Sequence, residues 1–181
     1  LNITARDMAK RIGVYWHLFP EQAQARKAIW NGIDKKGRRI LDQVFPGFSK
    51  CSSRRRPAGI CKRVSNQEML IETIFGSIWQ MAGSDNYDSL VGSNPVAVTF
   101  TEWALSNPAA WDYIRPILLE NGGWALFITT PRGQNHAYST HMMAQKNDNW
   151  FDQVLPWNKT GILSEEDIQS ERDEGMSDAK I

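Results

Sequence analysis

The sequence predicts an α/β fold in which a mostly parallel sheet is covered by helices on both faces. Apolar runs of strand length alternate along the chain with segments of helical periodicity, an order typical of parallel sheets. The apolar runs are continuous rather than alternating, as expected of strands buried on both sides. With 181 residues, 41% hydrophobic and 23% charged, the chain has the length and composition of one compact domain.

Charge, cysteine content and hydropathy narrow the classes of partner. The net charge of +1 at pH 7 creates no long-range field that would by itself indicate binding to nucleic acid or to an anionic membrane. Cys51 and Cys61 are the two cysteines, and no secretory signal precedes them, so reduced thiols in a cytosolic compartment are expected. No apolar stretch approaches the roughly 20 residues that cross a bilayer, so no membrane partner is expected.

Helical and strand patterns alternate from the first residues onward. Apolar residues recur at helical spacing from Leu1, and the apolar run 13–19 then predicts a buried strand. A helical stripe over 21–40 follows. Residues 45–64 contain proline, glycine, serine and three consecutive arginines without a sustained period, so they predict a surface loop.

The second half of the chain continues the alternation. We expect, in order, a hairpin with strands 69–75 and 78–82, a strand over 96–101, a helix that starts at Asn107-Pro108, a strand over 124–130, a helix over 135–146, a strand over 150–157 and a final helix capped by Ser164. Pro116 should shorten or kink the helix in which it lies. Asp167, three residues after Ser164, nearly completes a capping box.

Two neighbouring strands of the predicted sheet end in reactive side chains. The run VAVTF leads into Thr101 and Glu102, and the run WALFITT ends in Thr129 and Thr130. Ligands of parallel α/β sheets bind beyond the carboxyl ends of the strands. A carboxylate there can orient or deprotonate a water in line with a γ-phosphate, and hydroxyls beside it can bond that phosphate. A surface acid is the alternative for Glu102, and the residues alone leave both interpretations open.

The order of these motifs resembles that of one protein family, the large terminase subunit of tailed bacteriophages. The segments that carry the resemblance are YWHLFPEQAQARKAIW, GSIWQMAGSDNYDSLVG, VAVTFTEWALSNPAAWDYIRPILLENGGWALFITTPRGQNH and WNKTGILSEEDIQSERDEGMSDAKI. The resemblance runs over nearly the whole chain and is most specific from Ala82 to Asn135. Members of that family package phage DNA into a preformed head with an N-terminal ATPase domain and cut the DNA with a C-terminal nuclease.

The resemblance implies a fold and a set of site residues. The fold would be a three-layer, P-loop NTPase-like sandwich with a mostly parallel central sheet. Glu102 resembles the catalytic glutamate that follows the Walker B strand Val96 to Thr101. Thr129-Thr130-Pro131 resembles the coupling motif that transmits hydrolysis to DNA movement. Arg132 beside it is a candidate phosphate sensor, with a turn-stabilising surface arginine as the alternative.

Thr101 stands where many family members carry the aspartate that holds Mg²⁺ through water. A hydroxyl can accept a hydrogen bond from a metal-bound water, but it brings no negative charge. Metal affinity is therefore expected to rest more on the nucleotide phosphates and on the P-loop hydroxyl, and we expect no direct metal ligand in this chain. His136 and His141 are five residues apart, which is not the spacing that puts two ligands on one helix face.

The resemblance also implies an activity and partners. We expect hydrolysis of ATP with Mg²⁺ that drives double-stranded DNA into the viral procapsid. The expected partners are double-stranded phage DNA, the small terminase subunit, the portal protein and further copies of the chain in a ring on the procapsid. The expected location is the cytoplasm of the bacterial host, for a gene carried by a phage or prophage.

The sequence departs from the family at its ends and in one internal segment. No G-x-x-x-x-G-K-S/T motif occurs, so we expect residues 1–181 to be a partial ATPase domain, truncated at the N-terminus. The P-loop strand and turn would precede residue 1, and the nuclease would follow residue 181. Residues 47–63 do not resemble the family, although the segments before and after them do. A local frameshift or an insertion would each explain this difference.

Two other functions stay open. The chain could be a catalytically inactive, truncated prophage remnant that lacks the P-loop and the nuclease. A helicase-like ATPase outside DNA packaging is the weaker alternative, because the match over 82–135 is specific to terminases. In-frame coding sequence upstream of Leu1 with a P-loop motif would favour the motor, whereas a stop codon there would favour the remnant.

Overall fold

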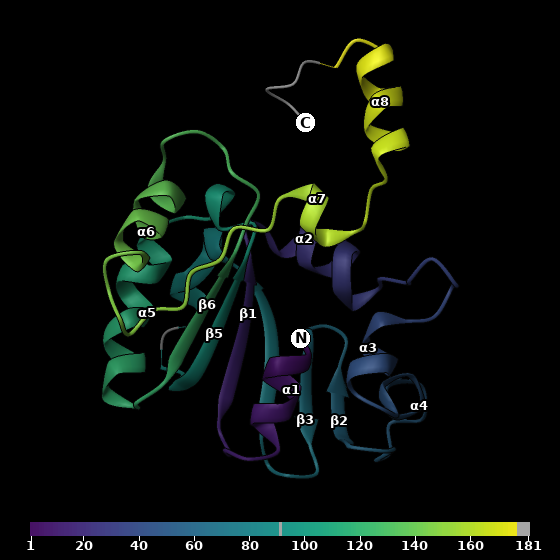
Figure 1. The fold of residues 1–181 in the computed structure, drawn as a ribbon. Helices are drawn as coiled ribbons and strands as arrows, with labels where there is room; N and C mark the ends of the chain where they lie inside the picture. The colour runs from purple at the N-terminus through teal and green to yellow at the C-terminus, as the bar shows by residue number, and fades with distance from the viewer. Residues whose placement is uncertain (91, 177–181) are drawn as a thin grey trace. The chain divides into compact units, whose positions relative to one another are not determined.

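A six-stranded sheet lies at the centre of the computed structural model, which describes residues 1–90 and 92–176 (Figure 1). Its order is β2-β3-β4-β1-β5-β6. The strands are β1 (Val14–Phe19), β2 (Cys61–Ser65), β3 (Leu70–Thr73), β4 (Ile78–Gly83), β5 (Pro95–Thr101) and β6 (Trp124–Ile128). β1 pairs in parallel with β4 and β5, and β6 is parallel to β5, whereas β3 runs antiparallel to β2 and β4. The predicted mostly parallel sheet is confirmed, and so is the β3–β4 hairpin.

Helices precede, separate and follow the strands. They are α1 (Asn2–Met8), α2 (Gln22–Ala25) continued by the π-helix η1 (Arg26–Trp30), α3 (Ile40–Val44), α4 (Phe48–Arg54), the 3-10 helices η2 (Ser84–Leu90) and η3 (Trp103–Leu105), α5 (Ala109–Glu120), α6 (His136–Ala144), α7 (Trp157–Thr160) and α8 (Glu165–Asp173). None of the described helices has the length and apolar character needed to span a bilayer. Ser164 and Asp167 complete the capping box that the sequence predicts for α8.

The chain divides into two units, Leu1–Tyr138 and Ser139–Ile181. The first unit contains the whole sheet and the beginning of α6. The second contains the rest of α6, α7 and α8. The predicted site residues all fall in the first unit, so its architecture is the one that positions them.

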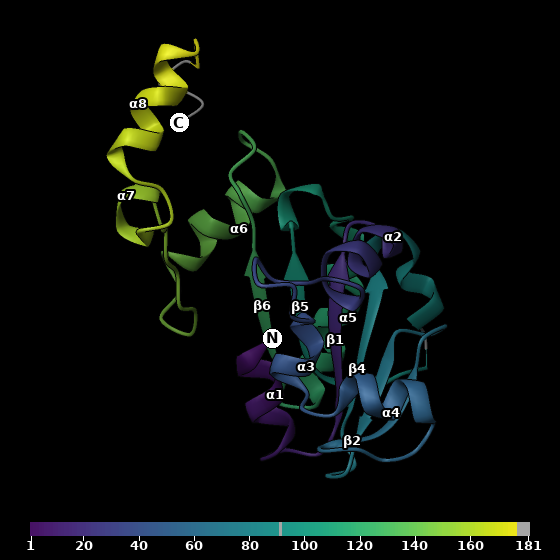
Figure 2. The same ribbon diagram turned by 90° about the vertical axis from the view of Figure 1, so that its right-hand side faces the viewer.

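Each face of the sheet carries its own apolar core. Successive strand residues point to opposite faces, so Tyr15 and Phe19 of β1 pack in one core while Trp16 and Leu18 pack in the other. The first core also holds buried residues of α1, η1, α3 and α4, and the second holds residues of η3 and α5. Figures 1 and 2 show these helices on the two sides of the sheet. The predicted three-layer arrangement is therefore confirmed for the first unit.

The predicted helix over 21–40 is wrong in extent, because the helical segment ends at Trp30 and α3 starts separately at Ile40. Asp34 explains the interruption. Its Oδ1 accepts backbone hydrogen bonds from Lys36 and Arg38, both at 2.9 Å. A short acidic side chain that bonds nearby backbone N–H groups stabilises a turn in competition with a helix.

The predicted loop over 45–64 is also wrong, because this segment forms α4 and most of β2. Its buried side chains in the first core are Phe45, Phe48, Cys51 and Cys61. Gly47 has a φ of 96°, and a Cβ there would lie 2.1 Å from the carbonyl oxygen of Ala58. The unusual segment 47–63 is thus an integral part of the fold. Both cysteines are free thiols within it, and burial raises the pKa of Cys61 to about 12.

One further prediction, the strand over 150–157, is wrong. Residues 151–156 form no strand, and the Phe151 side chain is 86% exposed. An apolar run needs a neighbouring strand for its backbone groups, and Pro156 also removes one donor. Pro116 does not shorten α5, which continues to Glu120. Burial of Ala110, Ile114 and Leu118 along one side of α5 holds the helix despite the lost N–H.

Candidate active site

Glu102 follows β5 in a left-handed backbone conformation, with φ 57° and ψ 47°. Its carbonyl oxygen accepts hydrogen bonds from the backbone N–H of Leu105 at 2.9 Å and from the Ser106 hydroxyl at 3.3 Å. For a residue with a Cβ this conformation costs about 1–2 kcal/mol. Such strain persists where the surrounding structure fixes it, and it is concentrated at functional sites.

The Glu102 side chain is half-buried at the carboxyl end of the sheet. Among residues 1–90 and 92–176, its carboxylate has neither a hydrogen bond nor an ion pair. A carboxylate without a protein partner can accept a proton from a water or a hydrogen bond from a cation-bound water. Glu102 thus lies at the carboxyl end of the sheet, and its catalytic role stays a prediction.

Thr101 contacts a residue that the sequence patterns did not single out. Its Oγ1 lies 2.8 Å from Nε2 of His17, which belongs to the neighbouring strand β1. The His17 side chain is 3% exposed and stacks on Phe19. Burial lowers the pKa of His17 to about 3. The imidazole is therefore neutral at physiological pH.

Thr129, at the end of β6, is bonded to the turn that follows Glu102. Its Oγ1 accepts a hydrogen bond from the backbone N–H of Ala104 at 3.0 Å and donates to the carbonyl oxygen of Thr130 at 3.1 Å. The hydroxyl of Thr129 is therefore engaged with backbone groups. The structure brings two of the predicted strand ends together through this contact.

Thr130, Pro131 and Arg132 are exposed. In the part of the chain that the structure describes, the Arg132 guanidinium makes no hydrogen bond or ion pair. An exposed guanidinium beside the strand end is able to reach a bound anion. The phosphate-sensor role of Arg132 stays a prediction.

Asn135 and His136 hold the same turn from the other side, which sequence reasoning missed. The Asn135 amide donates to the carbonyl oxygen of Ala104 at 3.2 Å, and His136 Nε2 donates to that of Trp103 at 2.7 Å. The His136 ring also packs edge-on against Trp103. The sequence showed both residues just after the coupling motif, but it could not show that they reach the turn next to Glu102.

No cluster of three or more His, Cys, Asp or Glu side chains suited to a metal ion occurs among the described residues. His141, considered with His136 in the sequence, instead bonds Asp152 in the second unit through Nδ1 at 2.8 Å. The side-chain oxygens of the candidate site at the end of β5 are the Thr101 hydroxyl and the Glu102 carboxylate.

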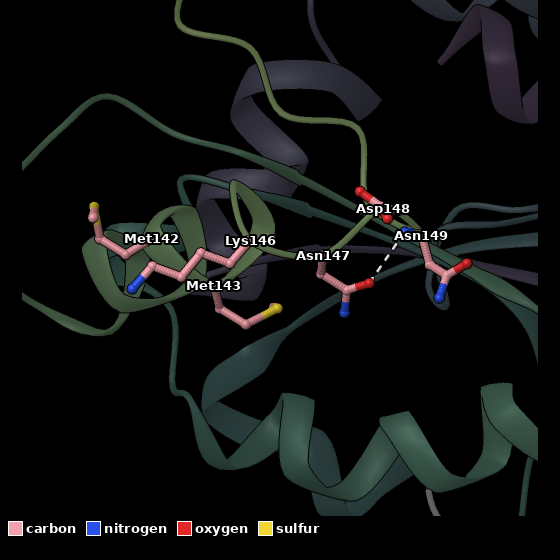
Figure 3. Close-up of a pocket in the computed structure, with 6 residues that line it drawn as sticks. All are labelled: Met142, Met143, Lys146, Asn147, Asp148 and Asn149. Carbon is pink, nitrogen blue, oxygen red and sulfur yellow. Dashed lines mark hydrogen bonds between the residues drawn. The ribbon is translucent and has the colours of Figure 1, made fainter.

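Two surface cavities lie outside the candidate site. An open cavity of about 650 Å³ in the second unit is lined by the end of α6 and the turn after it (Figure 3). Its residues are Met142, Met143, Lys146, Asn147, Asp148 and Asn149. A second cavity of about 390 Å³ is lined by α1 residues, Lys10 and Trp124. None of the predicted site residues lines either cavity.

The fold of the chain is similar to that of phage terminases. The large terminase ATPase domain of Thermus phage P74-26 is 18% identical, with a TM-score of 0.62, and the match covers 98% of this chain and 77% of that one. The large terminase of a second, thermophilic bacteriophage is 12% identical, with a TM-score of 0.59, and the match covers 93% of this chain and 39% of that one. No protein-family model and no curated protein sequence matches the chain. At these identities the similarity establishes the fold.

Proposed function

We propose that this chain belongs to the ATPase domain of a phage-type large terminase, which hydrolyses ATP to move double-stranded DNA into a procapsid. The observation that carries the proposal is Glu102, held in a strained backbone conformation at the end of buried β5 with a carboxylate that has no partner among the described residues. The fold shared with terminase ATPase domains supports the same function.

Glu102 is proposed as the general base. The backbone at the end of a buried strand is held rigidly, which keeps the carboxylate within reach of one position for the attacking water. Three side chains hold the turn after Glu102, namely Thr129, Asn135 and His136. They keep the base in place without contacting its carboxylate, so they are positioning residues.

The proposed cofactors are ATP and Mg²⁺. The large terminase of the second, thermophilic bacteriophage was solved in complex with ADP. The hydroxyl and carboxylate oxygens of Thr101 and Glu102 are the ligand type that suits Mg²⁺ through its bound waters. When bound, the ion would neutralise charge on the phosphates. Because the described residues offer no cluster that could hold the ion directly, metal binding would depend on the nucleotide.

Thr129, Thr130 and Pro131 are proposed as the coupling segment. The bond between Thr129 and the backbone of Ala104 joins the end of β6 to the turn that follows Glu102. A displacement at either strand end would therefore act on the other. Arg132 is proposed to sense the phosphate, since its exposed guanidinium follows this segment directly.

The proposed partners follow from the same function. They are double-stranded phage DNA, the small terminase subunit, the portal protein and further copies of the chain in a ring on the procapsid. The proposed location is the host cytoplasm. Each is a proposal that depends on the motor function of this chain.

The test is turnover in a version of the chain extended upstream of Leu1 to include a P-loop. We expect the extended chain to hydrolyse ATP and Glu102→Gln to lower turnover by about 10²–10⁴-fold, because a general base contributes that much. Nucleotide binding should remain nearly intact, as measured by calorimetry. Glu120→Gln, an exposed acid at the end of α5, is the matched control. Undiminished hydrolysis in Glu102→Gln would overturn the assignment.

An inactive prophage remnant is the second candidate, and the 181 residues contain no Gly-Lys pair and no P-loop motif. P-loop amides and the adjacent lysine form the cradle for the β- and γ-phosphates. We therefore expect the 181-residue chain to show no measurable ATP binding by calorimetry. A micromolar dissociation constant for this chain would contradict that expectation.

A further inference from the structure

The contact between His17 and Thr101 bears on what Thr101 can bind. We infer that His17 is a positioning residue that donates a hydrogen bond to Thr101 and so makes the Thr101 hydroxyl a donor toward an anionic oxygen beyond the end of β5. This inference rests on the proposed function only in identifying that oxygen as a nucleotide phosphate. The donor geometry itself follows from the fold.

Strand pairing brings the two residues together across 84 positions of sequence. His17 of β1 is in register with Thr99 of β5, so the side chains of His17, Thr99 and Thr101 lie on the same face of the sheet. The ring of His17 stacks on Phe19, with centroids 5.5 Å apart, and meets Trp79 edge-on at 6.0 Å. These rings fix the plane of the imidazole with Nε2 toward Thr101.

The surroundings of His17 decide where its proton lies. Its Nε2 lies beside the Thr101 hydroxyl, whereas its buried Nδ1 has no hydrogen-bond partner within the described residues. A neutral imidazole has one N–H donor and one bare nitrogen acceptor. Orphaned buried N–H donors are rarer than under-satisfied acceptors. The proton is therefore better placed on Nε2, where it is donated to Thr101 Oγ1.

The proton on His17 determines the role of Thr101. With Nε2–H as the donor, one lone pair of Oγ1 is used and the hydroxyl hydrogen must find another acceptor. The Thr101 hydroxyl has no second partner among the described residues. A phosphate oxygen can only accept, so it complements this hydroxyl, while the remaining lone pair of Oγ1 can still accept from a metal-bound water. Thr101 thus gains a direct role toward the phosphate that its place in the sequence did not indicate.

The first experiment determines which ring nitrogen of His17 carries the proton, in the 181-residue chain without nucleotide. Long-range ¹H–¹⁵N spectra of histidine-labelled protein should show His17 with a protonated Nε2 and a bare Nδ1. Thr101→Val should shift the Nε2 resonance and speed exchange of its proton, whereas Thr101→Ser, which keeps the hydroxyl, should leave both nearly unchanged. A wild-type His17 protonated on Nδ1, or no response to Thr101→Val in a folded chain, would overturn the inference.

The second experiment measures ATP affinity by calorimetry in the chain extended to include a P-loop. Thr101→Val should weaken binding on the order of tenfold or more, the effect of losing one hydrogen bond to a charged group, and Thr101→Ser should not. His17→Leu should weaken binding in the same way, while His17→Gln, whose amide can donate from a similar position, should restore it. Equal affinities of Thr101→Val and Thr101→Ser would refute the phosphate contact.

The two experiments separate this inference from the proposed function. An extended wild-type chain that binds no ATP would refute the proposed function. The first experiment would still test whether the proton of His17 lies on Nε2, because it needs no nucleotide. Conversely, a chain that hydrolyses ATP through Glu102 with His17 protonated on Nδ1 would refute only the inference. A loss of affinity in His17→Leu without rescue by His17→Gln would also count against a donor role for His17.

Discussion

The ends of β5 and β6 carry the predicted site residues, and the fold holds these ends in different ways. Val98 and Phe100 of β5 are fully buried, and the strand leads into the strained backbone of Glu102. β6 is only half-buried, contrary to the prediction of a strand covered on both faces, and it leads into exposed Thr129 and Thr130. The proposed base thus follows the more buried strand, and Thr129 at the end of the other strand bonds the turn after it.

The difference follows from the order of the sheet. β5 has a neighbouring strand on each side, β1 and β6. β6 lies at the edge of the sheet, and β5 is its one neighbour among the described strands. A strand with one neighbour has an unpaired edge and fewer contacts. Beyond the bond of Thr129 to Ala104, the exposed residues Thr130 and Pro131 are therefore less constrained, which suits the coupling role proposed for this segment.

Acid should lower the free energy of unfolding through His17, the β1 residue that bonds the end of β5. The pKa of His17 is about 3 in the folded state and about 6.5 when unfolded, so the unfolded state binds more protons between these values and stability falls as pH falls. At pH 5 this group alone should lower the free energy of unfolding by about 2 kcal/mol relative to pH 7.5. Urea unfolding at pH 7.5 and pH 5 measures this difference. The free energy of unfolding should fall less in His17→Gln than in the wild type, and it should fall as much in the control Thr130→Val as in the wild type. Equal losses in His17→Gln and wild type would contradict this prediction.

The bracing role of β6 can be tested at two adjacent threonines. Thr129→Val removes the acceptor of the Ala104 N–H, and an unsatisfied buried donor costs about 1–2 kcal/mol of stability. Thr130→Val is the matched control, because Thr130 is exposed and its change should stay within about 0.5 kcal/mol. Urea unfolding measures both. Indistinguishable variants would mean that β6 does not brace the turn after Glu102.

The smallest expected effect concerns the strain at Glu102. Glycine adopts the left-handed conformation without a Cβ clash, so Glu102→Gly should raise the free energy of unfolding, by up to about 1 kcal/mol after the entropy of glycine is subtracted. Glu102→Ala keeps the Cβ and should bring no such gain. Thermal unfolding of the two variants provides the comparison. A less stable Glu102→Gly than Glu102→Ala would show that the conformation is not strained.

Buried strands were the elements most easily predicted from the sequence. The apolar runs of β1 and β5, and the Gly76-Ser77 turn of the hairpin, carry local signals that the tertiary structure does not override. The segment of α4 and β2 carried no such signal, because it contributes a few buried residues among many polar ones. Its order comes from packing, including the close approach of Gly47 to Ala58. Local pattern cannot reveal such contacts.

The candidate site also contains residues whose contacts could not be predicted from local sequence pattern. Glu102 could be proposed from the sequence because it directly follows a strand, and resemblance to terminases supplied its role. His17 could not, since a lone histidine in an apolar strand reads as a core residue until the register of β1 on β5 places it beside Thr101. Asn135 and His136 were hidden for a similar reason, because their bonds to the turn after Glu102 span more than 30 positions.

The central place of β1 has a consequence for biosynthesis. Its two neighbours, β4 and β5, end 64 and 82 residues after Phe19, at Gly83 and Thr101. At about 5–20 residues per second, a ribosome would complete β5 roughly 4–16 s after β1. During that interval the edge of β1 that pairs with β5 would be unpaired and exposed to other nascent chains. Chaperone protection of β1 should therefore influence the yield of folded protein more than protection of β6, which finds β5 already made.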